Sequence, residues 1–324
     1  MFRPLCTTGL VVLSLFPGLP APARERDATE QKAIAYVEKI EGRVEIDRDK
    51  PEKPVIGVDL VGCKLPEGTL ARLGVFKKLQ RLNLGQTAIA DAELTPLKGF
   101  TALETLELSG TSITDKGLAH LEDLPRLHTL GLRGDAIRDA GLVALKKLPK
   151  LQHLDLSDTG ISDKGLAHLR GLHELRSLSL YHTAITDAGI IYLKDMKNIQ
   201  ILSLPQTRIT DAALTHLAGL KELRTLSLSS TDVKGVGLTH LKELSRLQSL
   251  GLANTPITDA GLAAVKDLGK LQQLYLTGTK ITDKGLVHLK GLTHLRQLDL
   301  GNTKVSEAGI ADLRKTLPKV NVLH

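Results

Sequence analysis

A phrase of 24 residues is repeated along most of this chain, and it limits the possible fold more than any other feature. The phrase reads L-x-x-L-x-L-x-x-T-x-I-T-D-x-G-L-x-x-L-x-x-L-x-x. Its ten copies begin at Leu79, Leu103, Leu127, Leu151, Leu175, Ile199, Leu223, Leu247, Leu271 and Leu295. A weaker eleventh copy precedes them from Val55. A unit this short cannot bury its apolar side alone, so the copies are expected to stack on one another into a solenoid.

Two spacings inside the phrase predict its secondary structure. In the copy that begins at Leu103, Leu106 and Leu108 alternate with polar residues, which predicts a short strand with buried leucines. Residues at the third, fifth and seventh positions of each copy should then lie on the opposite face. The I-T-D-x-G-L segment offers N-capping side chains, and the leucines that follow at three-residue spacing predict a short α or 3₁₀ helix.

Because every copy runs in the same direction, the strands are expected to pair in parallel along the whole array. The helical side of each repeat is wider than the strand side, so stacking should place the strands on a concave face and the helices on a convex face. The threonines that recur at the ninth position are expected to form a buried ladder that satisfies the backbone of the turn. The predicted fold class is therefore a curved α/β solenoid with a parallel concave sheet.

Residues 1–23 predict a secretory signal peptide. Arg3 gives a positive start, residues 10–16 form an apolar run, and Ala21-Pro22-Ala23 is a small-residue cleavage site. The mature chain is then expected to begin at Arg24 and to be exported to the periplasm, the cell envelope or the extracellular space. No other segment is long and apolar enough to predict a membrane span.

Residues 24–54 predict an N-terminal cap for the array. The segment from Asp27 to Glu41 has helical spacing, residues 44–47 alternate like a short strand, and a charged loop with two prolines follows. Such a cap would cover the apolar end of the first repeat. The array of about eleven repeats is assigned to residues 55–319, and residues 320–324 are assigned to a terminal strand fragment.

The 24-residue phrase resembles a leucine-rich repeat, and its I-T-D-x-G-L half is similar to the repeats of F-box leucine-rich-repeat proteins. The whole pattern resembles exported bacterial leucine-rich-repeat proteins of unassigned role. Nothing upstream of Val55 resembles an F-box, so the resemblance implies a binding scaffold and not a role in the ubiquitin pathway. In this family the usual binding face is the concave sheet, which corresponds to the third, fifth and seventh positions of each copy here.

On the predicted concave face most side chains are small and polar, and a few larger ones interrupt them. The predicted ligand-binding residues are Arg133, His153, Asp155, Tyr181, His182 and Tyr275. Tyrosine and arginine are the residue types that most often anchor protein interfaces. Arg133 and Tyr181 are expected to flank a ligand side chain or loop, with Asp155 as an acceptor between them.

A second surface is basic. The chain has a formal charge of +7, which permits anionic partners without requiring them. The twentieth position is basic in eight copies: Lys98, Lys146, Arg170, Lys194, Lys242, Lys266, Lys290 and Arg314. This convex stripe is explained by solubility and helix C-terminal preference, or alternatively by binding to an anionic envelope polymer. Nucleic acid is not expected, because only 2% of the residues are aromatic and could stack on bases.

Catalytic and metal sites are not predicted. His153, Asp155, Ser177 and Ser179 contain the residue types of a Ser-His-Asp site, but strand N–H groups inside a sheet are not free to form an oxyanion hole. Histidines recur at the eighteenth position, in His120, His168, His216, His240 and His288. Equal positions in alternate repeats lie about 10 Å apart, which is too far for shared ligation. The sequence therefore predicts a non-enzymatic, cofactor-free, exported scaffold that binds a protein or another macromolecular ligand on its concave face. The alternative is an envelope-associated structural protein that uses its basic convex stripe.

Overall fold

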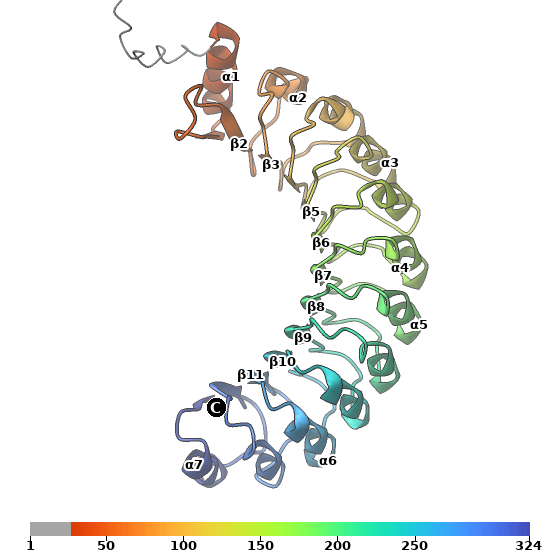
Figure 1. Ribbon diagram of the computed structural model, residues 1–324, viewed down its shortest axis with the longest axis vertical. Coiled ribbons are helices and arrows are strands. Elements are labelled where there is room, and N and C mark those ends of the chain that lie inside the picture. The colour runs from red at the N-terminus through yellow and green to blue at the C-terminus, as the bar shows by residue number, and fades with distance from the viewer. Residues whose placement is uncertain (1–26) are drawn as a thin grey trace, which may run out of the picture.

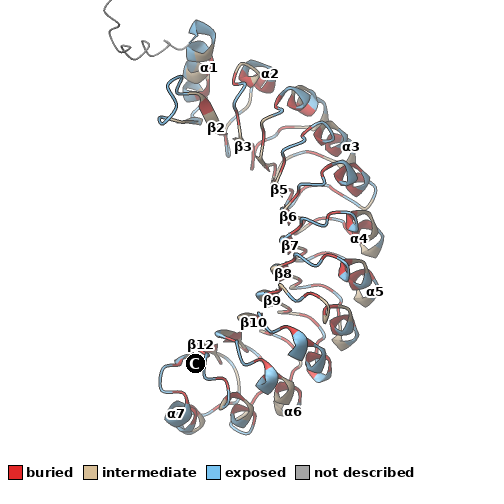
Figure 2. Ribbon diagram, in the orientation of Figure 1, coloured by how far each residue is buried: buried red, intermediate tan, exposed pale blue. Residues whose placement is uncertain are grey.

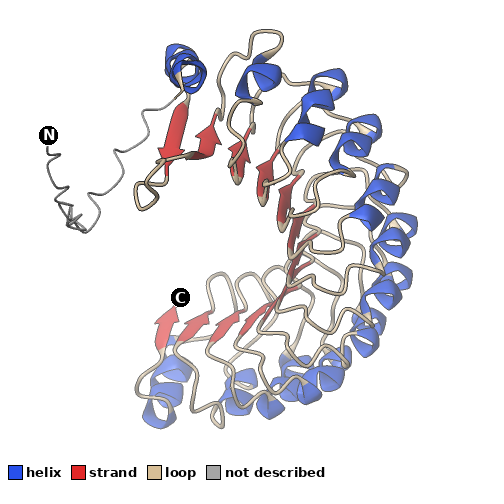
Figure 3. Ribbon diagram, turned by 45° about the horizontal axis from the view of Figure 1, so that its top comes forward, coloured by secondary structure: helices blue, strands red, loops and turns tan. Residues whose placement is uncertain are grey.

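The computed structural model describes residues 27–324, which form one curved ribbon of stacked repeats (Figure 1). The strands line the inner side of the curve and the helices follow its outer side (Figure 3). This arrangement confirms the predicted α/β solenoid with a parallel concave sheet. The predicted signal peptide, residues 1–23, lies outside the described residues.

A single sheet of thirteen strands runs along the concave face in the order of the sequence. The strands are β1 Arg43–Ile46, β2 Val55–Asp59, β3 Arg81–Asn83, β4 Thr105–Glu107, β5 Thr129–Gly131, β6 His153–Asp155, β7 Ser177–Ser179, β8 Ile201–Ser203, β9 Thr225–Ser227, β10 Ser249–Gly251, β11 Gln273–Tyr275, β12 Gln297–Asp299 and β13 Asn321–Leu323. Strand β1 pairs with β2 antiparallel, whereas the later neighbours pair in parallel. Residues 24 apart are in register, as Leu154 is with Leu178, so each repeat adds one rung to the sheet.

The convex side consists of short helices, as the leucine spacing predicts. The α-helices are α1 Ala28–Lys39, α2 Thr69–Leu73, α3 Asp115–Leu118, α4 Asp163–Leu169, α5 Asp187–Ile190, α6 Asp259–Leu262 and α7 Glu307–Thr316. The 3₁₀ helices are η1 Asp91–Gly99, η2 Ala119–Leu121, η3 Gly141–Lys147, η4 Ile191–Leu193, η5 Asp211–His216, η6 Val236–Glu243, η7 Ala263–Asp267 and η8 Gly285–Leu289. Because the chain must return to the next strand, every helix inside the repeat array has ten residues or fewer.

Between the sheet and the helices runs one continuous apolar layer (Figure 2). In the fifth repeat Leu178 and Leu180 of the strand side are fully buried, and so are Ile190 and Leu193 of the helical side. No repeat closes this layer on its own, because its ends are covered only by the leucines of the adjacent repeats. Stacking is therefore the source of the apolar burial.

The N-terminal segment covers the first repeat. Helix α1 begins after Asp27, whose side chain accepts a hydrogen bond from the Thr29 amide at 3.1 Å. Tyr36 joins this helix to α2, because its hydroxyl lies 2.7 Å from Thr69 Oγ1 and the Arg72 guanidinium lies 5.0 Å from its ring centre. Helix α1 and strand β1 therefore lie beside the first repeat.

Each strand ends in a tight turn that needs a left-handed residue. The eighth residue of every repeat has a φ between 53° and 77°: Gln86, Gly110, Gly134, Asp158, His182, Gln206, Ser230, Asn254, Gly278 and Asn302. The threonine that follows closes the turn inside its own repeat. In the fifth repeat the Thr183 hydroxyl donates to the Leu180 carbonyl at 2.7 Å. Most of these hydroxyls therefore satisfy a turn carbonyl of their own repeat, as predicted, and do not bond to one another; Thr111 is an exception, since its hydroxyl donates to Asp135 of the next repeat.

A ladder between repeats is formed instead by the aspartate of the I-T-D-x-G-L segment. Asp163 accepts from the amide of Thr186 in the next repeat at 2.8 Å and from its hydroxyl at 2.6 Å. Gly189 leaves room for that carboxylate, since a Cβ there would lie 2.3 Å from Asp163 Oδ1. Equivalent pairs are Asp91–Thr114, Asp139–Ser162, Asp187–Thr210, Asp259–Thr282 and Asp283–Ser306. The seventh repeat carries Gly235 at this position and contributes no carboxylate to the ladder.

The third repeat departs from the turn pattern at Asp135, where nine other copies carry threonine. This side chain is buried, and its Oδ1 accepts from the Thr111 amide at 2.7 Å and from the Thr111 hydroxyl at 3.0 Å. Its Oδ2 is buried without a hydrogen-bond partner. Burial raises the pKa of Asp135 to about 7, although the hydrogen bonds from Thr111 act in the opposite direction.

The strand register predicts how two neighbouring substitutions in β8 and its turn should differ. Leu204 is fully buried, so Leu204→Ala should lower the free energy of unfolding by about 2–5 kcal/mol. Ser203 points to the concave face, and Ser203→Ala should cost about 0.5 kcal/mol or less. Urea unfolding of both variants measures the difference. Equal losses would show that the assigned register is wrong.

Replacing Asp135 with the threonine found in nine other copies is predicted to stabilise the fold by an amount that depends on pH. The pKa of its carboxyl is higher in the folded than in the unfolded chain, so the folded state binds the proton more tightly. Its contribution to stability is therefore greatest below pH 4 and is lost as the pH rises through 7. Asp135→Thr should raise the free energy of unfolding at pH 8 by ~2–4 kcal/mol and by clearly less at pH 5. Urea unfolding at both pH values tests this, and an equal gain at both would mean that Asp135 does not titrate between them.

Candidate binding site on the concave face

The concave face is exposed through the alternation of each strand. Leu130 and Leu132 point into the core, so Thr129, Gly131 and Arg133 lie on the opposite side. The same alternation applies in every repeat, and most of the concave positions carry serine, threonine or glycine. The few larger side chains therefore project beyond the short side chains that make up the rest of the concave surface.

Four of the larger side chains form one network, which we call the concave cluster: Arg133, Asp158, Tyr181 and His182. Asp158 lies at its centre, because Arg133 Nε is 2.9 Å from Asp158 Oδ2 and His182 Nδ1 is 2.9 Å from Asp158 Oδ1. The Arg133 guanidinium lies 5.4 Å from the centre of the Tyr181 ring, within the range of a cation–π contact. The rings of Tyr181 and His182 are 5.9 Å apart, so each side chain contacts at least one other.

The turn at the exit of each strand positions this cluster. Arg133 and Tyr181 occupy the seventh position of their repeats, and Asp158 and His182 occupy the left-handed eighth position. Asp158 N donates to the Tyr181 carbonyl at 2.8 Å, which ties the turn of the fourth repeat to that of the fifth. The stacked backbone thus fixes side chains from the third, fourth and fifth repeats beside one another.

Only some of the predicted ligand-binding residues belong to the concave cluster. Arg133, Tyr181 and His182 are brought together, but the carboxylate between them is Asp158, three residues beyond the predicted Asp155. The Asp155 carboxylate instead accepts from the amide and hydroxyl of Ser157, at 2.9 and 2.5 Å. Asp158 was missed because it is not at an odd-numbered strand position. Its position carries glycine or asparagine in five other repeats, a signal for a left-handed turn that the leucine spacing does not contain.

The other two predicted residues lie outside the network. His153 is exposed at the start of β6, where it is in register with Ser177 of the adjacent strand β7. Tyr275 ends β11, four strands beyond the strand that leads to Tyr181, which corresponds to roughly 19 Å at the usual spacing. Ile201 of β8 was also missed, and its side chain exposes apolar surface on the same face.

A pair of carboxylates lies on the N-terminal side of the concave cluster. Glu107, Gly131 and Asp155 are in register on consecutive strands, and the Glu107 side chain lies over Gly131. Burial raises the pKa of Glu107, the Asp155 charge raises it further, and a hydrogen bond from Ser109 opposes the shift. The two carboxylates are therefore close enough for their charges to interact across Gly131.

The side chains that contain the residue types of a Ser-His-Asp site are not linked into one hydrogen-bonded set in the described residues. The Asp155 carboxylate is bonded to Ser157, and Ser157 Oγ lies 2.8 Å from Ser179 Oγ, with no hydrogen bond from His153 to any of them in residues 27–324. Within the same described range, no group of three histidine, cysteine or acidic side chains is placed to hold a metal ion. None of the described helices combines the length and apolar character needed to cross a membrane.

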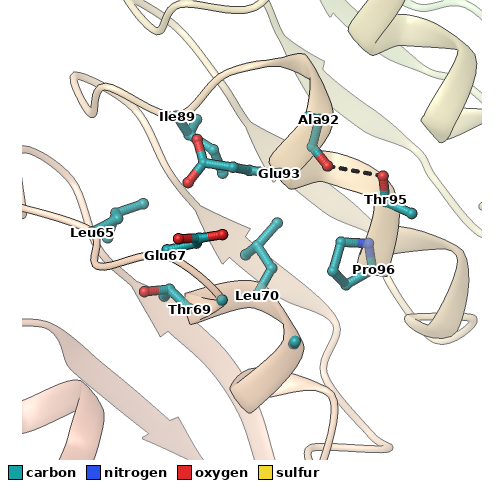
Figure 4. Close-up of a pocket in the computed structure, with 11 residues that line it drawn as sticks. Leu65, Glu67, Thr69, Leu70, Ile89, Ala92, Glu93, Thr95 and Pro96 are labelled. Atoms are coloured by element: carbon teal, nitrogen blue, oxygen red, sulfur yellow. Dashed lines mark hydrogen bonds between the residues drawn. The ribbon is translucent and has the colours of Figure 1, made fainter.

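Two hollows lie near the N-terminal end, away from the concave cluster. A cavity of about 280 Å³ lies between α2 and η1 and is lined by Leu65, Leu70, Ile89, Pro96 and the acidic Glu67 and Glu93 (Figure 4). Glu93 Oε2 accepts from the Ala90 amide at 3.0 Å and so caps its own helix. A concave groove of about 340 Å³ lies beside β1, where Arg81 Nε donates to Glu45 at 3.0 Å. Both hollows arise where the irregular first repeat meets the regular array.

Part of the convex stripe is already engaged inside the protein. Lys290 Nζ lies 2.7 Å from Asp312, which holds the pKa of that carboxyl below its ordinary value. The Arg170 guanidinium lies 5.9 Å from the centre of the Tyr192 ring. These two members therefore have partners on their own surface.

Comparison with known proteins agrees with this architecture. A leucine-rich-repeat family model matches residues 125–185 and 245–305, and a second leucine-rich-repeat model matches residues 101–121. A search of curated proteins returned no match.

Solved structures with the same fold include two internalins from Listeria monocytogenes. One, inlF, has a TM-score of 0.62 and 22% identity, over 94% of this chain and 97% of its own. The other, an internalin C2, has a TM-score of 0.53 and 29% identity, over 64% of this chain and 84% of its own. A TDR receptor has a TM-score of 0.58 and 17% identity over 83% of this chain, which spans 46% of that receptor. The repeat, the parallel concave sheet and these matches identify the chain as a leucine-rich-repeat protein.

Proposed function

We propose that this protein is a non-enzymatic, exported scaffold that binds a protein ligand on its concave face, centred on the concave cluster. The observation that carries the proposal is the shared carboxylate of Asp158, which holds Arg133 and His182 in fixed positions beside Tyr181. His153, Asp155 and Tyr275 are proposed as further contacts along the same face.

The concave cluster has the physical properties of an interface anchor. Its central carboxylate is more shielded than its two partners, with 29% of the Asp158 side chain exposed, whereas 56% of Arg133 and 65% of His182 remain exposed for contact. Side chains that are already held in place lose less conformational entropy when a ligand binds. Tyrosine and arginine are also the residue types that most often contribute large binding energies.

The surroundings of the cluster favour a macromolecular ligand over a small molecule. Neighbouring concave positions carry Ser157, Ser179 and Gly134, so a protein surface can approach closely without steric conflict. The cluster lies on an open face, and neither of the two hollows near the N-terminal end includes it. A small ligand needs a pocket that buries most of its surface. A protein ligand can bind an open face, because its own surface covers the contact area.

Export is part of the proposal and rests on the sequence of residues 1–23. The prediction is that the protein recovered from the envelope or the medium begins at Arg24. Intact-mass measurement of the purified exported protein tests this directly. Recovery of the exported protein with Met1 still present would overturn the signal-peptide assignment.

The concave site predicts which substitutions weaken ligand binding. The partner is first captured from an envelope extract with the immobilised protein and is then purified for titration. Tyr181→Ala should lose about 2 kcal/mol or more of binding free energy, because a ring that fills an interface pocket is removed. Arg133→Ala should lose a comparable amount, since it removes the cation–π contact and one partner of Asp158. Both side chains are outside the core, so thermal unfolding should change little.

The chain offers a matched control for the arginine substitution. Arg170 contacts the ring of Tyr192 on the convex side, so Arg170→Ala removes the same type of pair from the opposite face. It should leave affinity unchanged. The convex stripe is tested by neutralising Lys242 and Lys290, which should matter only at low ionic strength. Normal affinity of the Tyr181 variant, together with lost affinity of the lysine variant, would refute the concave site and favour association through the convex stripe.

A further inference from the structure

A second surface with the composition of a binding site lies at the edge where the chain enters its strands. A groove of about 280 Å³ spans the seventh to ninth repeats there. It is lined by Arg224, Ser245, Arg246, Gln248, Lys270 and Gln272, which we call the entry groove. Every lining side chain carries an N–H or O–H donor and none is a carboxylate. The groove shares no residue with the concave cluster or with the convex stripe.

The backbone holds the side chains of the entry groove in a regular row. The Arg224 carbonyl accepts from the amides of Gln248 and Ser249, and the Gln248 carbonyl accepts from those of Gln272 and Gln273, at 2.8 to 2.9 Å. These bonds continue the sheet by one residue before each strand. Arg224, Gln248 and Gln272 are therefore spaced at about the strand separation of 4.8 Å.

The entry groove has a net positive charge. Neither Arg224 nor Lys270 has an ion-pair partner among the described residues, whereas Arg246 pairs with Glu222. A second nearby carboxylate, Glu243, is paired with Lys221 at 3.4 Å. Two cations are thus left uncompensated in a surface built from hydrogen-bond donors.

The row continues beyond the groove toward the C-terminus. Arg296 occupies the equivalent position in the tenth repeat, and its amide donates to the Gln272 carbonyl at 2.8 Å. Its side chain is exposed. The positive edge therefore extends along the stacking direction, which suits an extended ligand better than a compact one.

We infer that the entry groove binds an acidic polysaccharide, a linear sugar chain with a carboxylate on each unit. The groove is open, and an exposed ion pair contributes about 1 kcal/mol or less, so a single free anion would be held weakly. A linear polyanion can contact several cations at once. After its first contact, each further contact forms within the same complex and therefore at a high effective concentration. Ser245, Gln248 and Gln272 provide neutral donors and acceptors between the cations, which match sugar hydroxyl groups. The lining contains no aromatic ring, which disfavours nucleic acid.

The test is calorimetric titration of the intact protein with a size-defined oligogalacturonate at low and moderate salt. The wild-type protein should bind the oligomer and should bind monomeric galacturonate or inorganic phosphate far more weakly. Removing both free cations in Arg224→Gln with Lys270→Gln should weaken binding about tenfold. The variant should also show a shallower dependence of affinity on salt, because fewer counterions are released on binding.

A matched control removes the same charge from the same part of the array on the opposite edge. Lys234→Gln with Lys280→Gln neutralises two exposed lysines that follow the strands of the seventh and ninth repeats. It should change the affinity less than about twofold, because these charges lie across the ribbon from the groove. Equal losses in the two double variants, unchanged binding by the groove variant, or no binding by the wild-type protein would each overturn the inference. Tighter binding of single-stranded DNA than of the oligogalacturonate would overturn the choice of a polysaccharide.

Discussion

The structure depends on a layer of leucines that no repeat can close by itself. The strand leucines and the helical leucines of one repeat belong to one apolar layer, and their remaining surface is covered by adjacent repeats. Residues 24 apart must therefore stay in register along the whole ribbon. The parallel sheet, the position of the helices and the rows of equivalent side chains on each face all follow from that register.

Polar contacts between repeats strengthen this stacking at one edge. Most ladder aspartates accept two hydrogen bonds from the next repeat. For Asp163, Gly189 of the I-T-D-x-G-L segment leaves space for the carboxylate. The aspartate, threonine and glycine of this segment thus have two roles. They form a contact between neighbouring repeats, and they lie where the helix of each repeat begins. Gly235 interrupts the ladder in the seventh repeat, so the apolar layer there acts without that carboxylate.

The two surfaces with binding potential arise where individual repeats depart from the consensus. At the exit edge, Arg133 and Tyr181 replace residues that are small in most other copies. Asp158 and His182 occupy the neighbouring turn positions, and stacking makes the four side chains one cluster. At the entry edge, Arg224 and Lys270 leave positive charge without a partner. The register turns scattered differences in sequence into continuous patches, because equivalent positions are adjacent in space.

The sequence by itself determined the repeat length, the alternation of strand and short helix, the parallel concave sheet and which leucines are buried. These features depend on local spacing, and the period repeats that spacing in every copy. Only the tertiary structure decided that Asp158, and not Asp155, joins Arg133 to His182, because this choice depends on the left-handed turn that follows each strand. The same is true of the aspartate ladder and of the buried Asp135 carboxylate. In each case the partner lies in a neighbouring repeat, about 24 residues away, and the geometry of stacking selects which polar atoms meet.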